Sequence, residues 1–380
     1  MVNPMPNANP TTFPCSGCGA ELEFKPGTAE LACPHCGSRT PIAPAAEVVE
    51  EIDYASTLAQ LADQHDAEDR IVVHCESCGA NVPLEPNVTS QACPFCGSNI
   101  VATGQSTRVL RPRALLPFGV TSEQARARFG AWLSGLWFAP SDLKRLASVE
   151  RVALASGSTS SGGTALVGMY VPYWTFDARS VTPYTGQRGD NYTVPVSYTV
   201  MVNGRPQVQT RLETRIRWSG VSGCVGDAFD DVLVHASTSL PADRLAALGA
   251  WDLRALVPYD DRYLSGFRSE SYTIDLPHGF EAARAVMVEG IKATIRRDIG
   301  GDHQRIHSMS PQFSAITFKH VLLPIWISTF RYRGTLFRFL VNARTGQVSG
   351  QRPYSAWKIA AVVLAILMAV GVIIFLASRS

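Results

Sequence analysis

Lysine is scarce in this sequence of 380 residues, and the positions of the few lysines exclude one large class of enzyme. None of the five lysines follows a glycine, so the phosphate-binding loop G-x4-G-K-[ST] is missing. The chain also lacks a G-x-S-x-G nucleophile turn and an H-E-x-x-H metal-binding helix. A motor ATPase is therefore excluded, and we predict that the protein is not an enzyme.

The first twelve residues lack the features of a secretory signal. They contain neither a basic segment nor an apolar run. The sequence therefore favours a reducing compartment, where paired cysteines bind metal rather than form disulfides.

Eight of the nine cysteines are arranged in two copies of one pattern, C-x2-C-x14-C-x2-C. The eight are Cys15, Cys18, Cys33 and Cys36 in the first copy and Cys75, Cys78, Cys93 and Cys96 in the second. The second cysteine of every pair precedes a glycine, which permits the tight turn that brings two sulfurs to one ion. The pattern predicts two zinc ribbons, each holding one structural Zn²⁺ through four cysteines. The remaining cysteine, Cys224, is predicted to be a buried or idle thiol, and His35 and His74 to lie outside the ligand set.

Charge is distributed unevenly along the chain. Residues 1–104 have a net charge of −10 and residues 105–380 a net charge of +12. The second ribbon contains no Lys or Arg, which disfavours nucleic acid as its partner, because phosphate binding depends on those side chains. We therefore expect a protein partner for the ribbons, and we note that anionic lipid could attract the basic body.

A run of nineteen residues without charge, 359–377, lies close to the C-terminus. At 1.5 Å per helical residue, it matches the ~30 Å core of a bilayer. Trp357 and Lys358 precede it and Arg379 follows it, as in interfacial anchors. The run predicts a transmembrane helix at 357–377 and a single-pass inner-membrane protein with most of its mass in the cytoplasm.

Hydrophobic periodicity predicts an α+β body with a bias toward strands. Helices are expected at Thr121–Phe138, where Thr121 is the N-cap, and at Phe280–Ile299. Asn203-Gly204 predicts a hairpin within 196–218, with Val208, Leu212, Ile216 and Trp218 on a core face and arginines on the other. The arginine face is typical of a solvated surface, and binding of an anionic surface is the alternative.

Two acidic pairs, Asp230-Asp231 near His235 and Asp260-Asp261, carry groups that can bind metal or move protons. Paired acids close to turns more often act as solvated or capping groups. No catalytic set follows from them.

Several stretches resemble a family of bacterial membrane proteins with zinc ribbons. Beside the two ribbons, they are RPRALLPF (111–118), WFAPSDLK (137–144), GMYVPYWTFDA (168–178), YTGQRG (184–189), FDDVLVHAS (229–237), TFKHVLLPIW (317–326) and VNARTGQVSG (341–350). Members often carry the label primosomal protein N′ (replication factor Y) or superfamily II helicase, and the chain is more distantly similar to YdjG-type proteins. The resemblance implies paired ribbons and a membrane segment, and through YdjG a link to envelope stress. Helicase activity does not follow, because the nucleotide-binding motifs are missing.

The sequence as a whole predicts six segments. They are ribbon 1 (1–40), an acidic linker (41–70), ribbon 2 (71–104), the α+β body (105–356), the transmembrane helix (357–377) and a short tail (378–380). The predicted function is that of a membrane-anchored adaptor that presents its zinc ribbons to protein partners. Nucleic-acid binding without helicase activity is the alternative.

Overall fold

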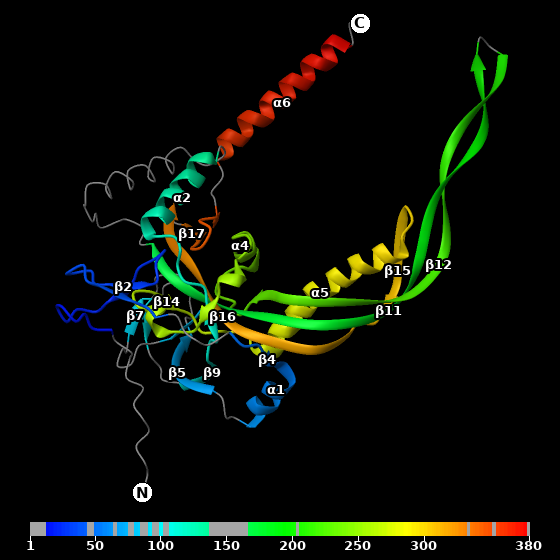
Figure 1. Ribbon diagram of the computed structural model, residues 1–380. Helices are drawn as coiled ribbons and strands as arrows, with labels where there is room; N and C mark the ends of the chain where they lie inside the picture. The colour runs from blue at the N-terminus through cyan, green and yellow to red at the C-terminus, as the bar shows by residue number, and fades with distance from the viewer. Residues whose placement is uncertain are drawn as a thin grey trace.

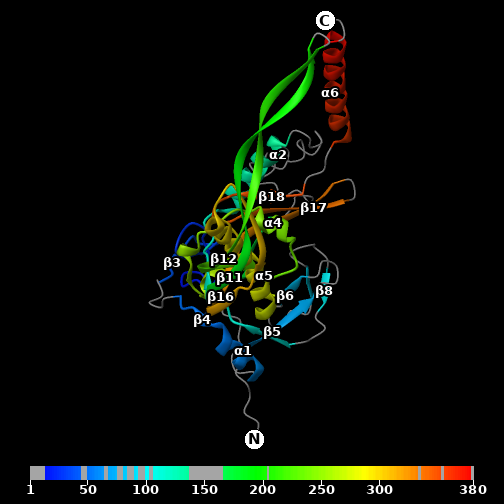
Figure 2. The same ribbon diagram turned by 90° about the vertical axis from the view of Figure 1, so that its right-hand side faces the viewer.

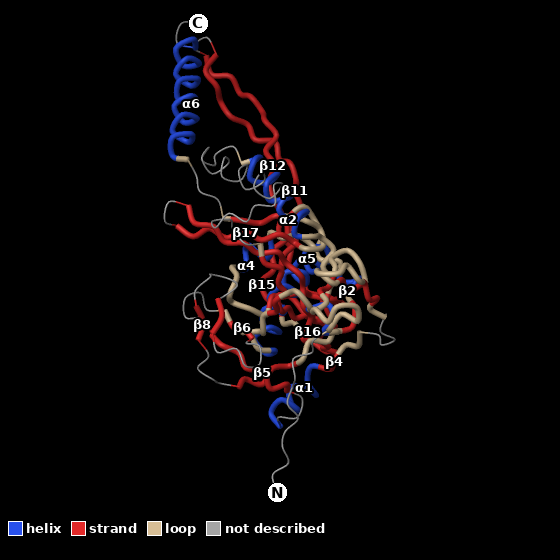
Figure 3. The backbone as a smooth tube through the Cα atoms, turned by 90° about the vertical axis from the view of Figure 1, so that its left-hand side faces the viewer, coloured by secondary structure: helices blue, strands red, loops and turns tan. Residues whose placement is uncertain are grey.

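A computed structural model of the chain describes residues 13–43, 49–63, 67–74, 80–83, 90–92, 99–101, 106–136, 166–202, 205–332, 335–351 and 355–377. Its central feature is a large, mainly antiparallel sheet, from which a long two-stranded hairpin extends away from the body (Figure 1). Figure 3 shows strands running through the body and along the full length of this hairpin.

Ten strands of the described part form the large sheet, with the central order β12-β11-β16-β10-β13. The ten strands are β4 (Ile52–Asp53), β10 (Ala114–Leu115), β11 (Val167–Val202), β12 (Arg205–His235), β13 (Val257–Pro258), β14 (Arg268–Ser269), β15 (His303–Met309), β16 (Gln312–Tyr332), β17 (Thr335–Asn342) and β18 (Val348–Gly350). Only the pairs β10–β16 and β11–β14 are parallel. The sheet therefore depends mainly on antiparallel pairing between segments far apart in the sequence.

Three smaller sheets are formed by strands that lie before residue 111 in the chain. The first contains β1 (Glu23–Phe24), β2 (Glu30–Ala32) and β3 (Arg39–Pro41), the second β5 (Ala67–His74), β6 (Asn81–Pro83) and β9 (Ser106–Leu110), and the third β7 (Ser90–Ala92) and β8 (Asn99–Val101).

The predicted hairpin is confirmed and is much longer than the sequence pattern indicated. β11 and β12 pair without a break in register from Ala178↔Phe229 to Val202↔Arg205. The prediction that one face of its second strand is core is wrong, because Val208 is 73% exposed and Leu212 is 74% exposed. Figure 2 shows that the outer half of the hairpin stands clear of the body. We call this outer half, residues 190–202 and 205–217, the arm.

Helix α5 (Leu276–Ile299) covers the root of this hairpin and confirms the helix predicted at Phe280–Ile299. Its N-cap is Asp275, whose carboxylate accepts a hydrogen bond from the backbone N–H of His278 at 3.0 Å. The helix approaches the sheet so closely that a Cβ on Gly279 would lie 2.6 Å from the Trp174 ring. Trp174 is fully buried and donates from Nε1 to the carbonyl oxygen of Ile274. Large buried side chains of this kind supply most of the stabilisation of the body.

Three further helices belong to the body. They are α1 (Tyr54–Asp63), α2 (Ser122–Gly135) and α4 (Ala242–Ala246), with short 3-10 turns at Leu253–Ala255 and Asp261–Leu264. The N-cap predicted for α2 is confirmed, because the Thr121 side chain accepts from the N–H of Gln124 while the Gln124 side chain accepts from the N–H of Thr121. This capping box defines where α2 begins.

The C-terminal helix α6 (Ala356–Ala377) coincides with the predicted transmembrane segment. In the described part of the chain, no helix combines the length and the apolarity that a membrane crossing requires. This finding contradicts the predicted transmembrane helix and the predicted single-pass inner-membrane location.

The predicted α+β class is also corrected, because the body is a β-rich fold built on one large antiparallel sheet. The difference arises mainly in β11, β12 and β16. Their alternating runs continue well past the short strands that single-sequence patterns indicate, because pairing partners elsewhere in the chain extend them.

Glu270 is a buried acid inside this fold. It is 2% exposed, and the hydroxyls of Ser237 and Ser239 both donate to its Oε1 atom. Burial raises the pKa of Glu270 to about 7, and the two serine hydrogen bonds oppose the shift. Because this pKa exceeds that of the unfolded chain, the carboxyl favours folding less as the pH rises from about 4.5 through 7.

We predict that Glu270→Gln stabilises the protein at pH 8 by about 3 kcal/mol and has little effect at pH 5. Glutamine retains an acceptor for the serine hydroxyls and cannot ionise. Urea denaturation of both proteins at the two pH values checks this, and an equal difference in stability at pH 5 and pH 8 would contradict it.

Candidate metal centre

The first cysteine pattern folds into two matching turns beside the small sheet β1-β2-β3, and we call this unit, residues 13–43, the ribbon. In the first turn the N–H of Gly19 donates to the carbonyl oxygen of Cys15 at 2.9 Å, and in the second the N–H of Gly37 donates to that of Cys33 at 3.1 Å. Gly19 has φ = 75° and Gly37 has φ = 74°, a region that L-residues with a Cβ rarely adopt. The glycines therefore play the role that the sequence assigned to them.

The four cysteine side chains converge on one point. The Sγ atoms of Cys15 and Cys36 lie 3.5 Å apart, as do those of Cys18 and Cys33, and all four lie within 4.8 Å of one another. Four sulfurs at about 2.3 Å from a central ion would be about 3.8 Å apart in a tetrahedron. A disulfide needs a separation of about 2.05 Å, so the four cysteines are free and fit a tetrahedral zinc ion.

Backbone amides prepare the site for thiolates. The N–H of Gly17 lies 3.4 Å from the Cys15 sulfur, and hydrogen bonds from Gly17 and Cys18 lower the pKa of Cys15 to about 6. The N–H of Cys36 lowers the pKa of Cys33 in the same way. Thiolates are the form in which cysteine binds metal, so the local backbone favours ligation.

The ribbon packs directly against the body and is hydrogen-bonded to it. Phe24 stacks edge-on against Tyr263 with ring centroids 5.1 Å apart, and its N–H donates to the carbonyl oxygen of Ser265 at 3.0 Å. The N–H of Gly27 donates to the carbonyl oxygen of Phe118 at 2.8 Å. Buried ribbon residues belong to the same apolar cluster as the body; those of the ribbon are Cys15, Leu22, Phe24, Leu31, Cys33 and Ile42. Two of the four ligands are thus part of a shared core.

The other candidate residues have mixed outcomes. All four cysteines of the second pattern lie outside the described residues, so the second zinc ion stays a prediction. His35 is exposed, and Cys224 is exposed on β12, apart from the four-cysteine cluster. The side chain of His74 is not described.

A second group of ligand atoms lies at the edge of the body and combines residues distant in sequence. Glu51, Asp177 and Asp230 bring one carboxylate oxygen each to within 4.8 Å of one another. The Lys319 ammonium lies 3.3 Å from Glu51 Oε1 and 2.8 Å from Asp231 Oδ1. This buried cation offsets one negative charge among Glu51, Asp177, Asp230 and Asp231, and we assign no metal to the group.

The carboxylates nevertheless perturb one another. Burial and the neighbouring Glu51 raise the pKa of Asp177 to about 6. Asp177 Oδ1 also accepts from the N–H of Asp231 at 2.7 Å, and Asp231 has an unusual φ of 51°. The sequence singled out Asp230-Asp231 but carried no signal that β4 would bring Glu51 beside them.

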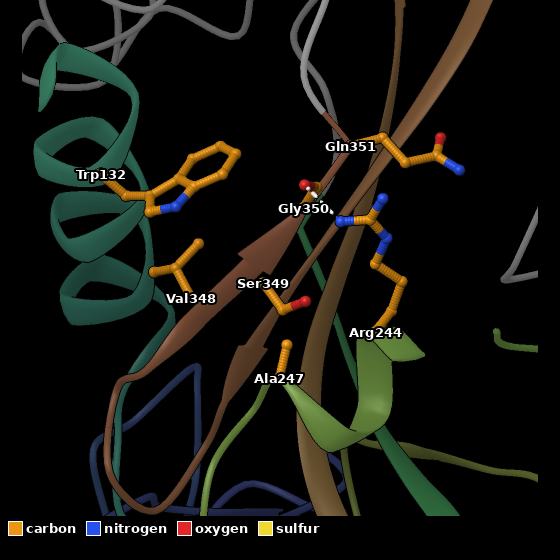
Figure 4. Close-up of a pocket in the computed structure, with 7 residues that line it drawn as sticks. All are labelled: Trp132, Arg244, Ala247, Val348, Ser349, Gly350 and Gln351. Carbon is orange, nitrogen blue, oxygen red and sulfur yellow. Dashed lines mark hydrogen bonds between the residues drawn. The ribbon is translucent and has the colours of Figure 1, made fainter. Parts of the chain in front are cut away.

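A cleft of about 500 Å³ lies between α2, α4 and β18 (Figure 4). Trp132 borders one side, and Arg244 on the other side donates from Nη1 to the carbonyl oxygen of Gly350 at 3.0 Å. Its described lining contains one ionisable side chain, that of Arg244. The cleft therefore supplies an arginine, an indole and small polar groups but no acid–base pair.

Nearly the whole chain is similar in sequence to a protein of Bacillus subtilis (strain 168) that is named "Uncharacterized protein YdjG". The two are 23% identical over 370 residues, which cover 92% of this chain and 92% of that protein. No family model matches the sequence, and no solved structure matches it. The similarity to YdjG-type proteins is thus confirmed, whereas no relation to a primosomal or helicase family is found.

We predict that Cys33→Ser removes zinc from the first ribbon and lowers the melting temperature by roughly 5–10 °C, because a buried ligand and its core contacts are lost together. Cys224→Ser is the matched control, since Cys224 is exposed and remote from the cluster. Zinc analysis and differential scanning calorimetry check both effects. If both variants have the melting temperature of the wild type, the ribbon does not stabilise the body.

Proposed function

We propose that the protein is a non-catalytic adaptor whose zinc-fastened ribbon is an interaction surface for a protein partner. The observation that carries the proposal is the two-sided ribbon. Its inner side shares the core of the body, while the edges of its two turns, at Ser16 and Pro34–His35, are exposed. The outer surface of the ribbon is rigid because the inner surface is packed against the body.

The ligand set supports a structural ion. Catalytic zinc needs a coordination position open to water or substrate, whereas four cysteines close the tetrahedron. A closed site contributes to folding and to the shape of the surface around it.

The charge of the ribbon favours a particular kind of partner. Residues 13–43 contain Glu21, Glu23 and Glu30 against Lys25 and Arg39. A zinc ion bound by four thiolates adds about −2, so the ribbon surface is acidic. A basic protein surface is therefore complementary, and a phosphate backbone is not.

The proposal extends to the second cysteine pattern, whose spacing is the same. We predict two zinc ions per chain, falling to one in Cys33→Ser, to one in Cys93→Ser and to none in the double variant. Elemental analysis of the purified full chain checks this. One ion in the wild type, unchanged in Cys93→Ser, would confine zinc binding to the first ribbon.

For the partner, we predict that reversing ribbon charge with Glu21→Lys and Glu23→Lys removes the proteins that crosslink to the ribbon and leaves zinc content unchanged. Both side chains are exposed, so the fold tolerates the change. Glu281→Lys on α5 is the control for charge reversal elsewhere on the surface. Crosslinking of the tagged chain in cells followed by mass spectrometry is the measurement.

Two results would count against this adaptor function. A set of crosslinked proteins that is the same in the ribbon variants and in the control would remove the ribbon as the interaction surface. Crosslinks that disappear on nuclease treatment would favour the alternative of nucleic-acid binding, for which the arginines of the arm are the available cations.

A further inference from the structure

The arm has two faces that differ in charge. Residues paired across β11 and β12 point to the same side, and sides alternate along each strand. One face carries four arginines and two acids, which are Arg205, Arg211, Arg215, Arg217, Asp190 and Glu213. The opposite face of the arm has no charged residue of β11 from Asn191 to Met201 or of β12 from Pro206 to Ile216. We call it the neutral face. Closer to the body, Arg305 of β15 lies on this side, 3.9 Å from the centre of the Trp218 ring.

The charged face covers its own apolar residues. The Arg211 guanidinium lies 5.6 Å from the centre of the Tyr198 ring, and that of Arg217 lies 6.0 Å from the Tyr192 ring. Beneath these side chains Val194 and Val196 are half-buried. Arginine stems commonly shield apolar surface in this way while the charge stays in water.

The apolar side chains of the neutral face are exposed to solvent. Val208 is 73% exposed, Leu212 is 74% exposed and Met201 is 69% exposed. Threonines alternate with them, among them Thr199, Thr210 and Thr214. Exposed apolar side chains that recur along one face in this way are a candidate interaction surface.

The arm also lacks support from a third strand. β15 pairs with β11 only as far as Gly189, and beyond the contacts of Asp302 and His303 with Asn191 the described part of the chain adds no further paired strand to β11 or β12. A two-stranded ribbon by itself is marginally stable in water and gains stability when one face is covered. The arm therefore needs a partner that covers the neutral face.

We propose that the partner is a second copy of this chain, whose arm stacks on the neutral face about a two-fold axis. In a two-fold contact each residue meets the same surface of its partner, so a charged face would place like charges opposite each other. The neutral face is the one face of the arm that meets an identical copy without repulsion. The charged face would repel itself.

The area of the arm suits a weak contact. Residues 190–202 at about 3.4 Å per residue give a face about 44 Å long, and a two-stranded ribbon is about 10 Å wide. Two stacked faces would then bury roughly 900 Å², which is at the low end of interface areas and typical of a transient dimer. The proposal concerns the arm and does not depend on zinc or on the ribbon partner.

The test is site-directed crosslinking of the full chain in a Cys224→Ser background. Val208, Thr210, Leu212 and Thr214 are replaced by cysteine one at a time on the neutral face. The matched series on the charged face is Gln207, Gln209, Arg211 and Arg215. A bis-maleimide spanning about 10 Å fits the spacing of two stacked sheets.

We expect dimers from the neutral series, with the highest yield at the position nearest the two-fold axis, and at least tenfold less from the charged series. Leu212→Glu, which puts a charge on the neutral face, should abolish the crosslinks of the neutral series, whereas Arg211→Glu should not. Circular dichroism of both variants establishes that they are folded. Equal yields from the two series, or yields unaffected by Leu212→Glu, would overturn the proposal.

Discussion

The position of β11 between β12 and β16 is the constraint on which the other features of this structure depend. Its backbone pairs with β12 from Tyr173 to Val202 and with β16 from Val167 to Val181. The inner part is therefore the centre of a broad sheet, and the outer part becomes the arm once β16 and then β15 end. One strand thus connects the buried core to the most exposed element of the body.

The ribbon is attached to this same frame. Phe118, which accepts a hydrogen bond from the ribbon at Gly27, stacks on Phe267 and meets Tyr170 of β11 edge-on. Cys15 and Cys33 of the four-cysteine cluster belong to that apolar cluster. A metal ion held by these cysteines would therefore be coupled to the packing at the centre of the sheet through shared aromatic contacts. Such an ion would hold a surface in place and also support part of the core.

The two faces of the arm illustrate why hydrophobic alternation is an incomplete guide. The pattern of Val208, Leu212 and Ile216 correctly places these residues on one side of a strand. It predicts that this side is buried, since alternation usually marks a half-buried strand. The structure leaves the side exposed, because no further strand of the described chain pairs with β11 or β12 beyond Gly189. Hydrophobic alternation thus indicates an apolar face that another element or molecule can cover, but it does not identify that element or molecule.

By itself, the sequence determined the features that short-range chemistry controls. The cysteine spacing and the following glycines predicted the site at Cys15–Cys36, the Thr121 capping box predicted the start of α2, and Asn203-Gly204 predicted the hairpin. Each depends on residues a few positions apart, where backbone geometry limits the choices. Tertiary structure alone decided the length of β11, the attachment of the ribbon to the body and the meeting of Glu51 with Lys319. The length of β11 depends on two partners, β12 and β16, that pair with different parts of it, and the other two features join segments up to 268 residues apart. Such pairing is selected by the burial of the whole core and leaves no local trace in the sequence.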